Sequence, residues 1–502
     1  MKKILLNIIE MRLRISISMI VLTCLITELG CKKLVEVAPP ITSVNGESVF
    51  KEDVTASAVL TGIYTNMSNT LINQTSMGWL TNVCFTTGLT GDELMLFDIS
   101  NTGFASYLNN SLSPQEFSTW ANVYKMIFIA NSAIEGVTKA TSLTPKIKVQ
   151  LLGEAKFVRA FCYFYLVNLY GDVPLALSTD YSINRFLPRA SKTIVYNQII
   201  QDLNEAKDLL SQDFISGDLV SKTSERLRPT KWAAMSMLSR TYLYTQDFSK
   251  AESEATSIIN NNTLFDLVPI DDAFKKNSKE SIWQLQPVGA NVESNTREGQ
   301  LFVLPSTGLS FSTNPVYLRP DLVASFEAND IRKTNWIKSI VNNGISFYYP
   351  NKYKVGRVNT SVVEYSTVLR LSEQYLIRAE ARIHLGKTQD GIADLNRIRK
   401  RATDTAMDPA EQLKQLSSAL SQIDALKAVE HERRVELFTE WGHRWFDLKR
   451  TQGFNVPSKS RADEVLSILK GVNWQTTDQL FPIPQIDITL NPNLVGHQNL
   501  GY

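Results

Sequence analysis

The sequence is poor in the residues that cross-link chains or bind metals. Its 502 residues include four cysteines and four histidines. Four cysteines are too few for the disulfide framework of a small secreted domain, and no two of them are spaced as C-x-x-C. His431 and Glu432 begin like the helix of a zinc protease, but Val435 stands where the second histidine would be, so we predict a structural role for His431. The sequence therefore indicates no catalytic metal and no cofactor.

The chain also lacks an excess of charge of either sign. It carries 52 lysines and arginines against 50 aspartates and glutamates, and without residues 1–30 the two counts are 48 and 48. A neutral body has no electrostatic reason to bind nucleic acid, which excludes that class of partner. Beyond residue 30, no apolar run approaches the roughly 20 residues that a membrane-spanning helix needs.

Motifs of the common enzyme classes are missing as well. The sequence contains no phosphate-binding loop, no G-x-G-x-x-G and no G-x-S-x-G. A glycosidase-like carboxylate pair cannot be singled out among 50 acidic residues. These absences favour a binding protein, and we predict that the chain is not an enzyme. Two alternatives stay open, namely a surface glycoside hydrolase or lyase and a structural protein that assembles a surface complex.

The N-terminal segment has the pattern of an export signal. Arg12 and Arg14 precede an apolar run of twelve residues, Ile15 to Ile26. A basic region followed by an apolar run of this length is typical of a secretory signal peptide and is too short for an ordinary transmembrane helix. Translation can start at Met1 or at Met11, which would give a shorter leader.

A cysteine follows the apolar run directly. Gly30 and Cys31 resemble a bacterial lipobox, in which the cysteine becomes the lipidated first residue, although Glu28 stands where an aliphatic residue is usual. We predict a lipoprotein signal peptide over 1–30, lipidation at Cys31 and a tether over 31–52. Acyl chains on Cys31 would hold the protein on a membrane. An ordinary signal peptide with an incidental cysteine is the alternative.

The body reads as a series of amphipathic helices. From Thr193 to Leu210 the apolar residues recur every three or four positions. Two helices at about 229–259 are separated by a short break at 246–248, and a second pair with the same pattern covers about 376–402. Paired helices with small residues on one face resemble tetratricopeptide-type units. Further helices are expected at 53–68, 115–138, 147–169 and 422–441.

Two long segments interrupt this pattern. Residues 70–112 and 263–360 are rich in polar residues, glycine and scattered aromatics, and the strand-like run 281–286 is short. Long loops on a helical scaffold are usually functional. We therefore predict one mainly α domain over 53–502, in which helical hairpins support a large irregular, loop-rich half, with ligand loops at about 70–112 and 263–316.

The segment 430–450 interleaves charged residues with large apolar ones. Aromatic residues at this density indicate burial, and buried charges must be paired. We therefore predict a structural network of ion pairs, with catalytic carboxylates as the alternative. The charged residues are Glu432, Arg433, Glu436, Glu440, Arg444, Asp447 and Arg450.

Motifs in this segment and around it carry a resemblance to a known family. They are ERRVEL at 432–437, GHRWFDLKR at 442–450, LRLSE at 369–373, YGDVPL at 170–175, FPIP at 481–484, NPNL at 491–494 and QNLGY at 498–502. The sequence resembles the SusD/RagB family of outer-membrane nutrient-binding lipoproteins. The resemblance runs from Cys31 to the last residue and is weakest at 70–112 and 263–316.

The resemblance implies a fold and a function. It implies tetratricopeptide-type hairpins that carry an irregular half, and capture of oligosaccharides, or in some members peptides, at the cell surface. It also implies that a SusC-like TonB-dependent outer-membrane transporter receives the ligand, and that the protein is not an enzyme.

Ligand contacts in the two variable loops follow from the chemistry of sugars. Aromatic faces stack on sugar C–H surfaces, while aspartate, asparagine and arginine side chains bind hydroxyls. For each aromatic, packing in the core is the competing interpretation. The predicted ligand-binding residues are Trp79, Asp92, Phe97 and Asn101 in the first loop, and Asn291, Arg297, Phe302, Phe311 and Tyr317 in the second.

Overall fold

The computed structural model describes residues 4, 8, 11–12, 46–69, 82–115, 119–288, 295–358 and 360–502. The chain divides into two units, Met1–Val49 and Phe50–Tyr502, of which the second contains nearly all of the described residues. The first unit contributes the short helix α2 (Gly46–Val49). Within the described ranges, we find no helix with the length and apolar character that crossing a membrane requires.

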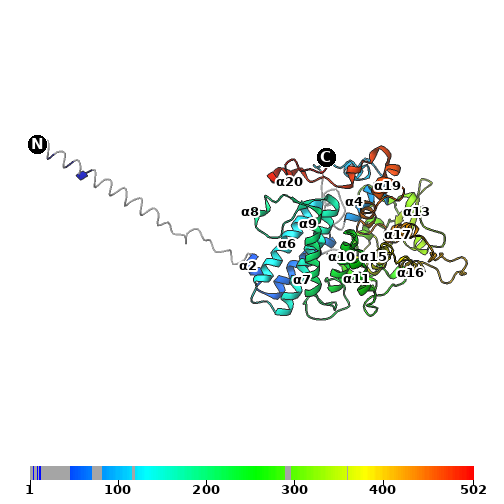
Figure 1. Cartoon of the computed structure of the whole chain (residues 1–502), viewed down its shortest axis with the longest axis horizontal. Helices are drawn as coiled ribbons and strands as arrows, with labels where there is room; N and C mark the ends of the chain where they lie inside the picture. The colour runs from blue at the N-terminus through cyan, green and yellow to red at the C-terminus, as the bar shows by residue number, and fades with distance from the viewer. Residues whose placement is uncertain are drawn as a thin grey trace. The chain divides into compact units, whose positions relative to one another are not determined.

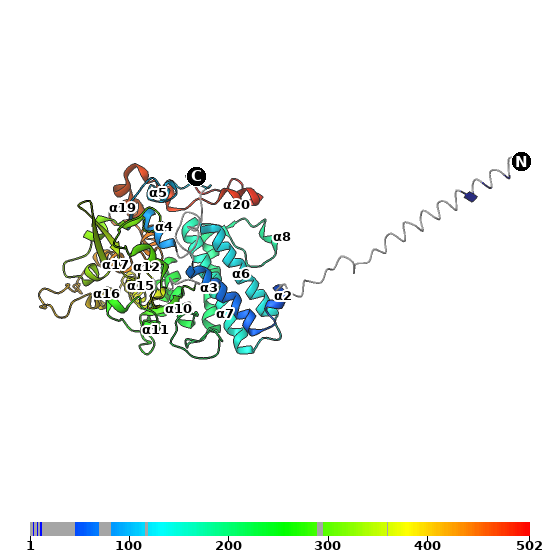
Figure 2. The same ribbon diagram turned by 180° about the vertical axis from the view of Figure 1, so that it is seen from behind.

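Helical hairpins form the scaffold of the unit Phe50–Tyr502. Consecutive long helices pack side by side, with α6 against α7, α7 against α9, α10 against α11 and α15 against α16. Figures 1 and 2 show α6 and α7 toward one end of this unit and α16 and α17 toward the other. The bounds are α3 (Asp53–Asn69), α6 (Thr119–Lys139), α7 (Pro145–Tyr170), α9 (Lys192–Leu209), α10 (Lys231–Tyr244), α11 (Phe248–Ile259), α15 (Leu371–His384) and α16 (Thr388–Arg401). The predicted mainly α scaffold of helical hairpins is confirmed.

Local chemistry explains where the two predicted hairpins turn. Between α10 and α11, Gln246 adopts a left-handed conformation with φ of 61°, and the Asp247 side chain caps α11 by accepting from the backbone N–H of Lys250. Between α15 and α16, Gly386 has φ of 78°. A Cβ atom at Gly391 would lie 2.5 Å from Cγ1 of Ile383, so only glycine allows these two helices to approach so closely.

Two buried strands join distant parts of the chain beneath the hairpins. β4 (Ser281–Leu285) pairs antiparallel with β8 (Ser366–Arg370), and every residue of both strands is buried. Trp283 of β4 packs edge-on against Phe157 and Phe161 of α7, with ring centroids 5.0 and 5.4 Å apart. The preference for Trp283 as a core residue is therefore confirmed.

The segments predicted to be irregular contain more regular structure than expected. The described part of 70–112 contains α4 (Val83–Thr90), β1 (Leu94–Leu96) and α5 (Thr102–Leu108). Every residue of α4 is buried, so no alternation of apolar and polar residues marks it in the sequence. The second segment contains β4, α12 (Arg297–Phe302), β5 (Val316–Leu318), α13 (Pro320–Ala324), α14 (Ile331–Asn335), β6 (Ile337–Asn342) and β7 (Ile345–Pro350).

The predicted helix at 422–441 ends early, which corrects its boundary. α17 (Gln422–Leu437) stops before Thr439, and α18 (His443–Arg450) begins after Gly442. Thr439, Trp441 and Gly442 all have positive φ, a conformation that cannot continue a right-handed helix. The turn lets charged residues of α17 and α18 face different neighbours.

Short elements complete the unit Phe50–Tyr502. The remaining helices and strands are β2 (Val173–Pro174), α8 (Tyr181–Asn184), β3 (Arg189–Ala190), α19 (Arg461–Lys470) and α20 (Gln485–Leu490), with 3-10 turns η3 (Ile270–Asp272), η4 (Gly471–Asn473), η5 (Thr476–Gln479) and η6 (Pro492–Leu494).

The charged residues of α17 form a buried network of ion pairs, as predicted. Glu436 is fully buried, and its carboxylate accepts from Arg332 at 2.8 Å, from Arg370 at 2.6 Å and from Arg401. Glu432 binds Arg332 at 2.6 Å in the same network. Burial opposes ionisation of Glu436, but the three guanidinium groups outweigh it and hold the pKa of this carboxyl well below its ordinary value.

Replacing Glu436 by glutamine should destabilise the fold strongly. Glu436→Gln keeps the volume but removes the charge that three buried arginines share, and we expect a loss of about 3–5 kcal/mol in the free energy of unfolding, measured by urea denaturation. The matched control is Asp213→Asn, which breaks the exposed pair with Lys222 and should change stability by less than about 1 kcal/mol. Equal effects of the two changes would contradict the structural role of the network.

Candidate functional site

Three aromatic side chains meet at β5, one from the residue after β1, one from β5 itself and one from β7. β1 and β5 pair antiparallel, which places Met95 opposite Tyr317, and the backbone N–H of Phe97 donates to the carbonyl of Pro315 at 2.8 Å. The hairpin of β6 and β7 packs against β5. These pairings bring segments near residues 97, 317 and 347 to one place.

Phe347 is the centre of this cluster. Its ring lies edge-on to Phe97 with centroids 5.7 Å apart and to Tyr317 with centroids 5.0 Å apart. Phe97 is 38% exposed, while Tyr317 and Phe347 are half-buried, so all three reach the surface. We call Phe97, Tyr317 and Phe347 the aromatic platform.

The position of Phe347 depends on a tight turn. Asn343 and Gly344 connect β6 to β7 with φ values of 51° and 80°, as in a type I′ turn. This turn sets the register in which Ile340 lies opposite Phe347. Sequence reasoning missed Phe347, although the Asn-Gly pair between two strand-like runs was a signal for a hairpin.

Phe311 lies on a neighbouring loop and is 46% exposed. Ser310 and Asn314 exchange backbone hydrogen bonds at 3.1 and 3.3 Å, so Phe311 sits in the turn between them. The Asn314 side chain donates to the carbonyls of Gln300 and Leu301, which ties this turn to α12. The structure thus offers Phe311 to solvent on a fixed loop.

Asp92 anchors the segment that leads through β1 to Phe97. It is 1% exposed, and its two carboxylate oxygens accept from Nε and Nη2 of Arg444 at 2.9 and 2.8 Å, while Arg434 lies 3.2 Å away. Burial opposes its ionisation, but Arg444 and Arg434 outweigh burial and lower the pKa of Asp92 well below its ordinary value. Asp92 was predicted as a ligand contact, and the structure places it in an internal ion pair instead.

Other predicted ligand residues have mixed positions. Asn101 is 3% exposed and caps α5 by accepting from the backbone N–H of Phe104, and Phe302 is buried in α12. Both side chains are packed inside the protein. Arg297 is half-buried at the start of α12 and donates to Gln300 at 2.8 Å. Trp79, Asn291 and the predicted lipidation site Cys31 lie outside the described residues.

Glu93 is buried next to Asp92 and has unusual acid–base behaviour. Its carboxylate accepts from the backbone N–H of Thr439 at 3.1 Å, in the turn between α17 and α18. Burial and the neighbouring Asp92 carboxylate raise its pKa to about 8, against the opposing effects of the Thr439 N–H, Lys352 and Arg444. Glu93 is therefore a protonated carboxyl near neutral pH that links β1 to the turn.

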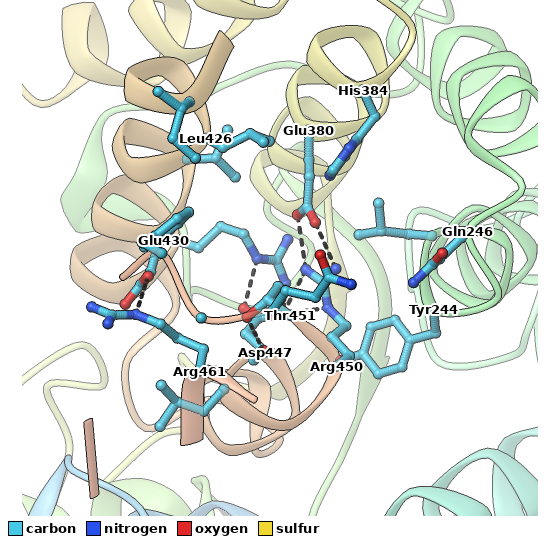
Figure 3. Close-up of a pocket in the computed structure, with 18 of the residues that line it drawn as sticks. Tyr244, Gln246, Glu380, His384, Leu426, Glu430, Asp447, Arg450, Thr451 and Arg461 are labelled. Carbon is cyan, nitrogen blue, oxygen red and sulfur yellow. Dashed lines mark hydrogen bonds and ion pairs between the residues drawn. The ribbon is translucent and has the colours of Figure 1, made fainter. Parts of the chain in front are cut away.

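A cavity of about 380 Å³ lies elsewhere in the same unit. α10, α15, α17 and α18 provide its walls, and Figure 3 shows Glu380 with Arg450, and Glu430 with Arg461, in paired contacts there. Among the described residues, no group of three histidine, cysteine, aspartate or glutamate side chains is placed to hold a metal ion. Cys84 and Cys162 are buried cysteines outside any disulfide, and burial raises the pKa of both thiols, which makes them poor nucleophiles.

Comparison with known proteins gives a consistent picture. A family model described as "SusD family" matches residues 311–502, and one described as "Starch-binding associating with outer membrane" matches residues 42–243. SusD-like protein P2 of Formosa agariphila is 27% identical over 95% of this chain and 98% of its own length. A SusD-like protein of Bacteroides ovatus is 26% identical over 69% of this chain and 67% of its own length.

Solved structures share the fold. A SusD homolog from Bacteroides thetaiotaomicron superposes with a TM-score of 0.73 at 21% identity, covering 92% of this chain and 99% of that one. A laminarin-binding SusD-like protein superposes with a TM-score of 0.69 at 23% identity, covering 90% of this chain and all of that one. At these identities the likeness establishes the fold.

Neutralising Glu93 should change how stability depends on pH. The pKa of this carboxyl is near its ordinary value of 4.5 in the unfolded chain and near 8 in the folded protein, so the group lowers stability progressively as pH rises between these values. Relative to the wild type, Glu93→Gln should gain up to about 1.4 kcal/mol per pH unit over this interval, measured by urea denaturation from pH 5 to 8. Parallel curves for the two proteins would show that Glu93 is ionised in the folded state.

Proposed function

Because the chain belongs to the SusD/RagB family, we propose that it binds oligosaccharides at the cell surface through the aromatic platform and its surrounding loops. The observation that carries this proposal is the meeting of Phe97, Tyr317 and Phe347 at the surface, with Phe311 exposed on a neighbouring loop. Phe97 lies in the segment 70–112, where the sequence resembles the family weakly, and Tyr317 and Phe347 lie in the loop-rich segment 263–360.

The platform suits sugars for a physical reason. Partly exposed aromatic rings offer apolar surface to sugar C–H groups, and their burial by a ligand releases water. Edge-on packing around Phe347 holds the three rings in place before a ligand arrives, which reduces the ordering that binding requires. The balance of 48 basic and 48 acidic residues after residue 30 suits a neutral ligand better than a polyanion.

Relatives suggest which polysaccharides to use as probes. One matching solved structure is named as laminarin-binding, and one matching family model is described as starch-binding. Laminarin and starch oligosaccharides are therefore the first ligands to screen by calorimetry with the soluble protein. Binding of peptides without any saccharide affinity would overturn the proposed ligand class in favour of peptides.

Substituting Phe347 should weaken saccharide binding without unfolding the protein. Phe347→Leu keeps an apolar side chain but removes the ring that contacts both Phe97 and Tyr317, and we expect at least a tenfold increase in Kd for the oligosaccharide that binds. The control is Phe186→Leu, because Phe186 is an exposed aromatic that is not part of the aromatic platform and its loss should leave Kd unchanged. Equal affinities of the Phe347 variant and the wild type would place the ligand elsewhere.

Two other functions lead to different observations. A glycoside hydrolase or lyase would release reducing ends or unsaturated products from laminarin or starch, whereas the proposed binding protein leaves both intact. The described carboxylates of the α17 network are bound by arginines, which suits a structural role. A purely structural assembly protein would show stable association with a membrane partner but no saccharide affinity.

We further propose that the protein is a surface lipoprotein of the outer membrane that delivers its ligand to a SusC-like TonB-dependent transporter. The family-model description of association with the outer membrane supports this location. Cys31 directly after the apolar run of the leader supports the lipid anchor, and residues 31–52 would form the tether. Transfer of a ligand from binding protein to transporter requires both to be held on the same membrane.

Removing the predicted lipid anchor tests the proposed location on the outer membrane. Cys31→Ala should abolish incorporation of labelled palmitate and shift the protein from the outer-membrane fraction to the soluble fraction, while saccharide affinity stays unchanged. The wild-type protein purified from membranes should bring a TonB-dependent transporter with it. Palmitate labelling that survives the change would assign lipidation to another residue, and purification without a transporter would contradict the partnership.

A further inference from the structure

The cavity of about 380 Å³ between the helical hairpins and α17–α18 is separate from the aromatic platform. Its size falls in the range of small-ligand pockets. Figure 3 shows Glu380 and His384 of α15 on one side, Tyr244 and Gln246 on another, and Leu426 and Glu430 of α17 opposite. The cavity is also lined by the apolar residues Leu426, Val429 and Leu448.

The acidic groups of the cavity already have partners. Asp447 accepts from Nε of Arg433 at 2.7 Å and from Nε of Arg450 at 2.8 Å. Glu380 accepts from both terminal nitrogens of Arg450 at 2.6 and 2.8 Å. Glu430 accepts from Arg444 at 3.0 Å and from Arg461 at 2.8 Å. Arg444 also binds Asp92. A ligand that donates hydrogen bonds or carries positive charge would have to compete with these arginines.

Two donors of the cavity lining have no acceptor among the residues that the structure describes. They are the hydroxyl of Tyr244 and Nη1 of Arg433, although the two residues are only 9% and 4% exposed. Buried donors are nearly always paired in folded proteins. Burial raises the pKa of Tyr244, so the phenol keeps the proton that it would donate. Tyr244 and Arg433 can therefore each donate a hydrogen bond to a ligand that carries an acceptor.

The aromatic rings of the cavity are not free to stack on sugars. The guanidinium of Arg450 lies 5.0 Å from the ring centre of Tyr244, and that of Arg461 lies 5.1 Å from the ring centre of Phe454. His384 stacks on Phe248 with ring centres 4.2 Å apart and planes 9° from parallel. This cavity therefore lacks the exposed faces that the aromatic platform offers.

We propose that this cavity is a second binding site, which takes a small organic carboxylate with an apolar body. The carboxylate would accept from Tyr244 Oη and Arg433 Nη1, and the apolar body would contact Leu426, Val429 and Leu448. Hydrogen bonds from arginine to a carboxylate are charge-assisted and are strong where water is excluded. The site works independently of saccharide binding at the platform.

N-acetyl-leucine and its amide are the probes that test this site. N-acetyl-leucine should bind, with chemical-shift changes at residues of the cavity lining in NMR spectra. N-acetyl-leucinamide has the same body without the charge and should bind at least tenfold more weakly. Absence of binding by the acid, or equal binding of acid and amide, would overturn the proposal.

Tyr244→Phe is the decisive variant. It removes a hydroxyl that has no hydrogen-bond partner among the described residues, so the melting temperature should stay the same or rise while Kd for N-acetyl-leucine increases at least fivefold. We prefer it to a change at Arg433, because Arg433 also binds Asp447. An unchanged Kd in Tyr244→Phe would overturn the proposed contact.

Two matched controls separate this site from fold stability and from the platform. Tyr196 is another buried tyrosine, and it does not line the cavity. Its hydroxyl donates a hydrogen bond of 2.9 Å to Oδ1 of Asn168. Tyr196→Phe should lower the melting temperature and leave Kd for N-acetyl-leucine unchanged. Phe347→Leu should also leave that Kd unchanged, and a loss of binding in this variant would place the carboxylate at the platform instead.

Discussion

The carboxylate of Glu436 is the point on which the arrangement of this protein depends. It binds Arg332, Arg370 and Arg401, which come from α14, from the end of β8 and from the end of α16. These segments belong both to the hairpin scaffold and to the segment between residues 263 and 360. Removing one partner of a buried charge strongly destabilises the fold. The network therefore fixes how the hairpin scaffold packs against the segment 263–360.

The same region also sets the position of the aromatic platform. Asp92 binds Arg444 of α18, and Glu93 accepts from Thr439 in the turn before it, so the start of β1 is attached to the α17–α18 corner. β1 then pairs with β5, and β5 packs against the hairpin that carries Phe347. The three short strands that position the platform are thereby attached to the buried network. Pre-organised aromatic surface is what binding of a weakly interacting ligand such as a sugar requires.

The success of sequence reasoning followed the strength of the local pattern. Helices such as α9 and α11, buried on one face only, were found because apolar residues recur every three or four positions. α4 was missed because all of its residues are buried and show no such recurrence. The predicted helix at 422–441 ran past the true end of α17 at Leu437, because the charged and aromatic residues that follow continue the helical pattern in the sequence. Asp92 was assigned to a ligand because its partner, Arg444, lies more than 350 residues away in the chain.

The sequence by itself determined the mainly helical class, the position of the hairpins and the presence of a paired charge network, because periodicity and the cost of unpaired buried charge act on residue types alone. Only the tertiary structure decided which charges pair, which aromatics reach the surface and which donors are left over. Phe97, Tyr317 and Phe347 become neighbours through strand pairing, and Tyr244 and Arg433 share a cavity through helix packing. These contacts join residues that are far apart in the sequence and share no local pattern. They can therefore be found only from the tertiary structure.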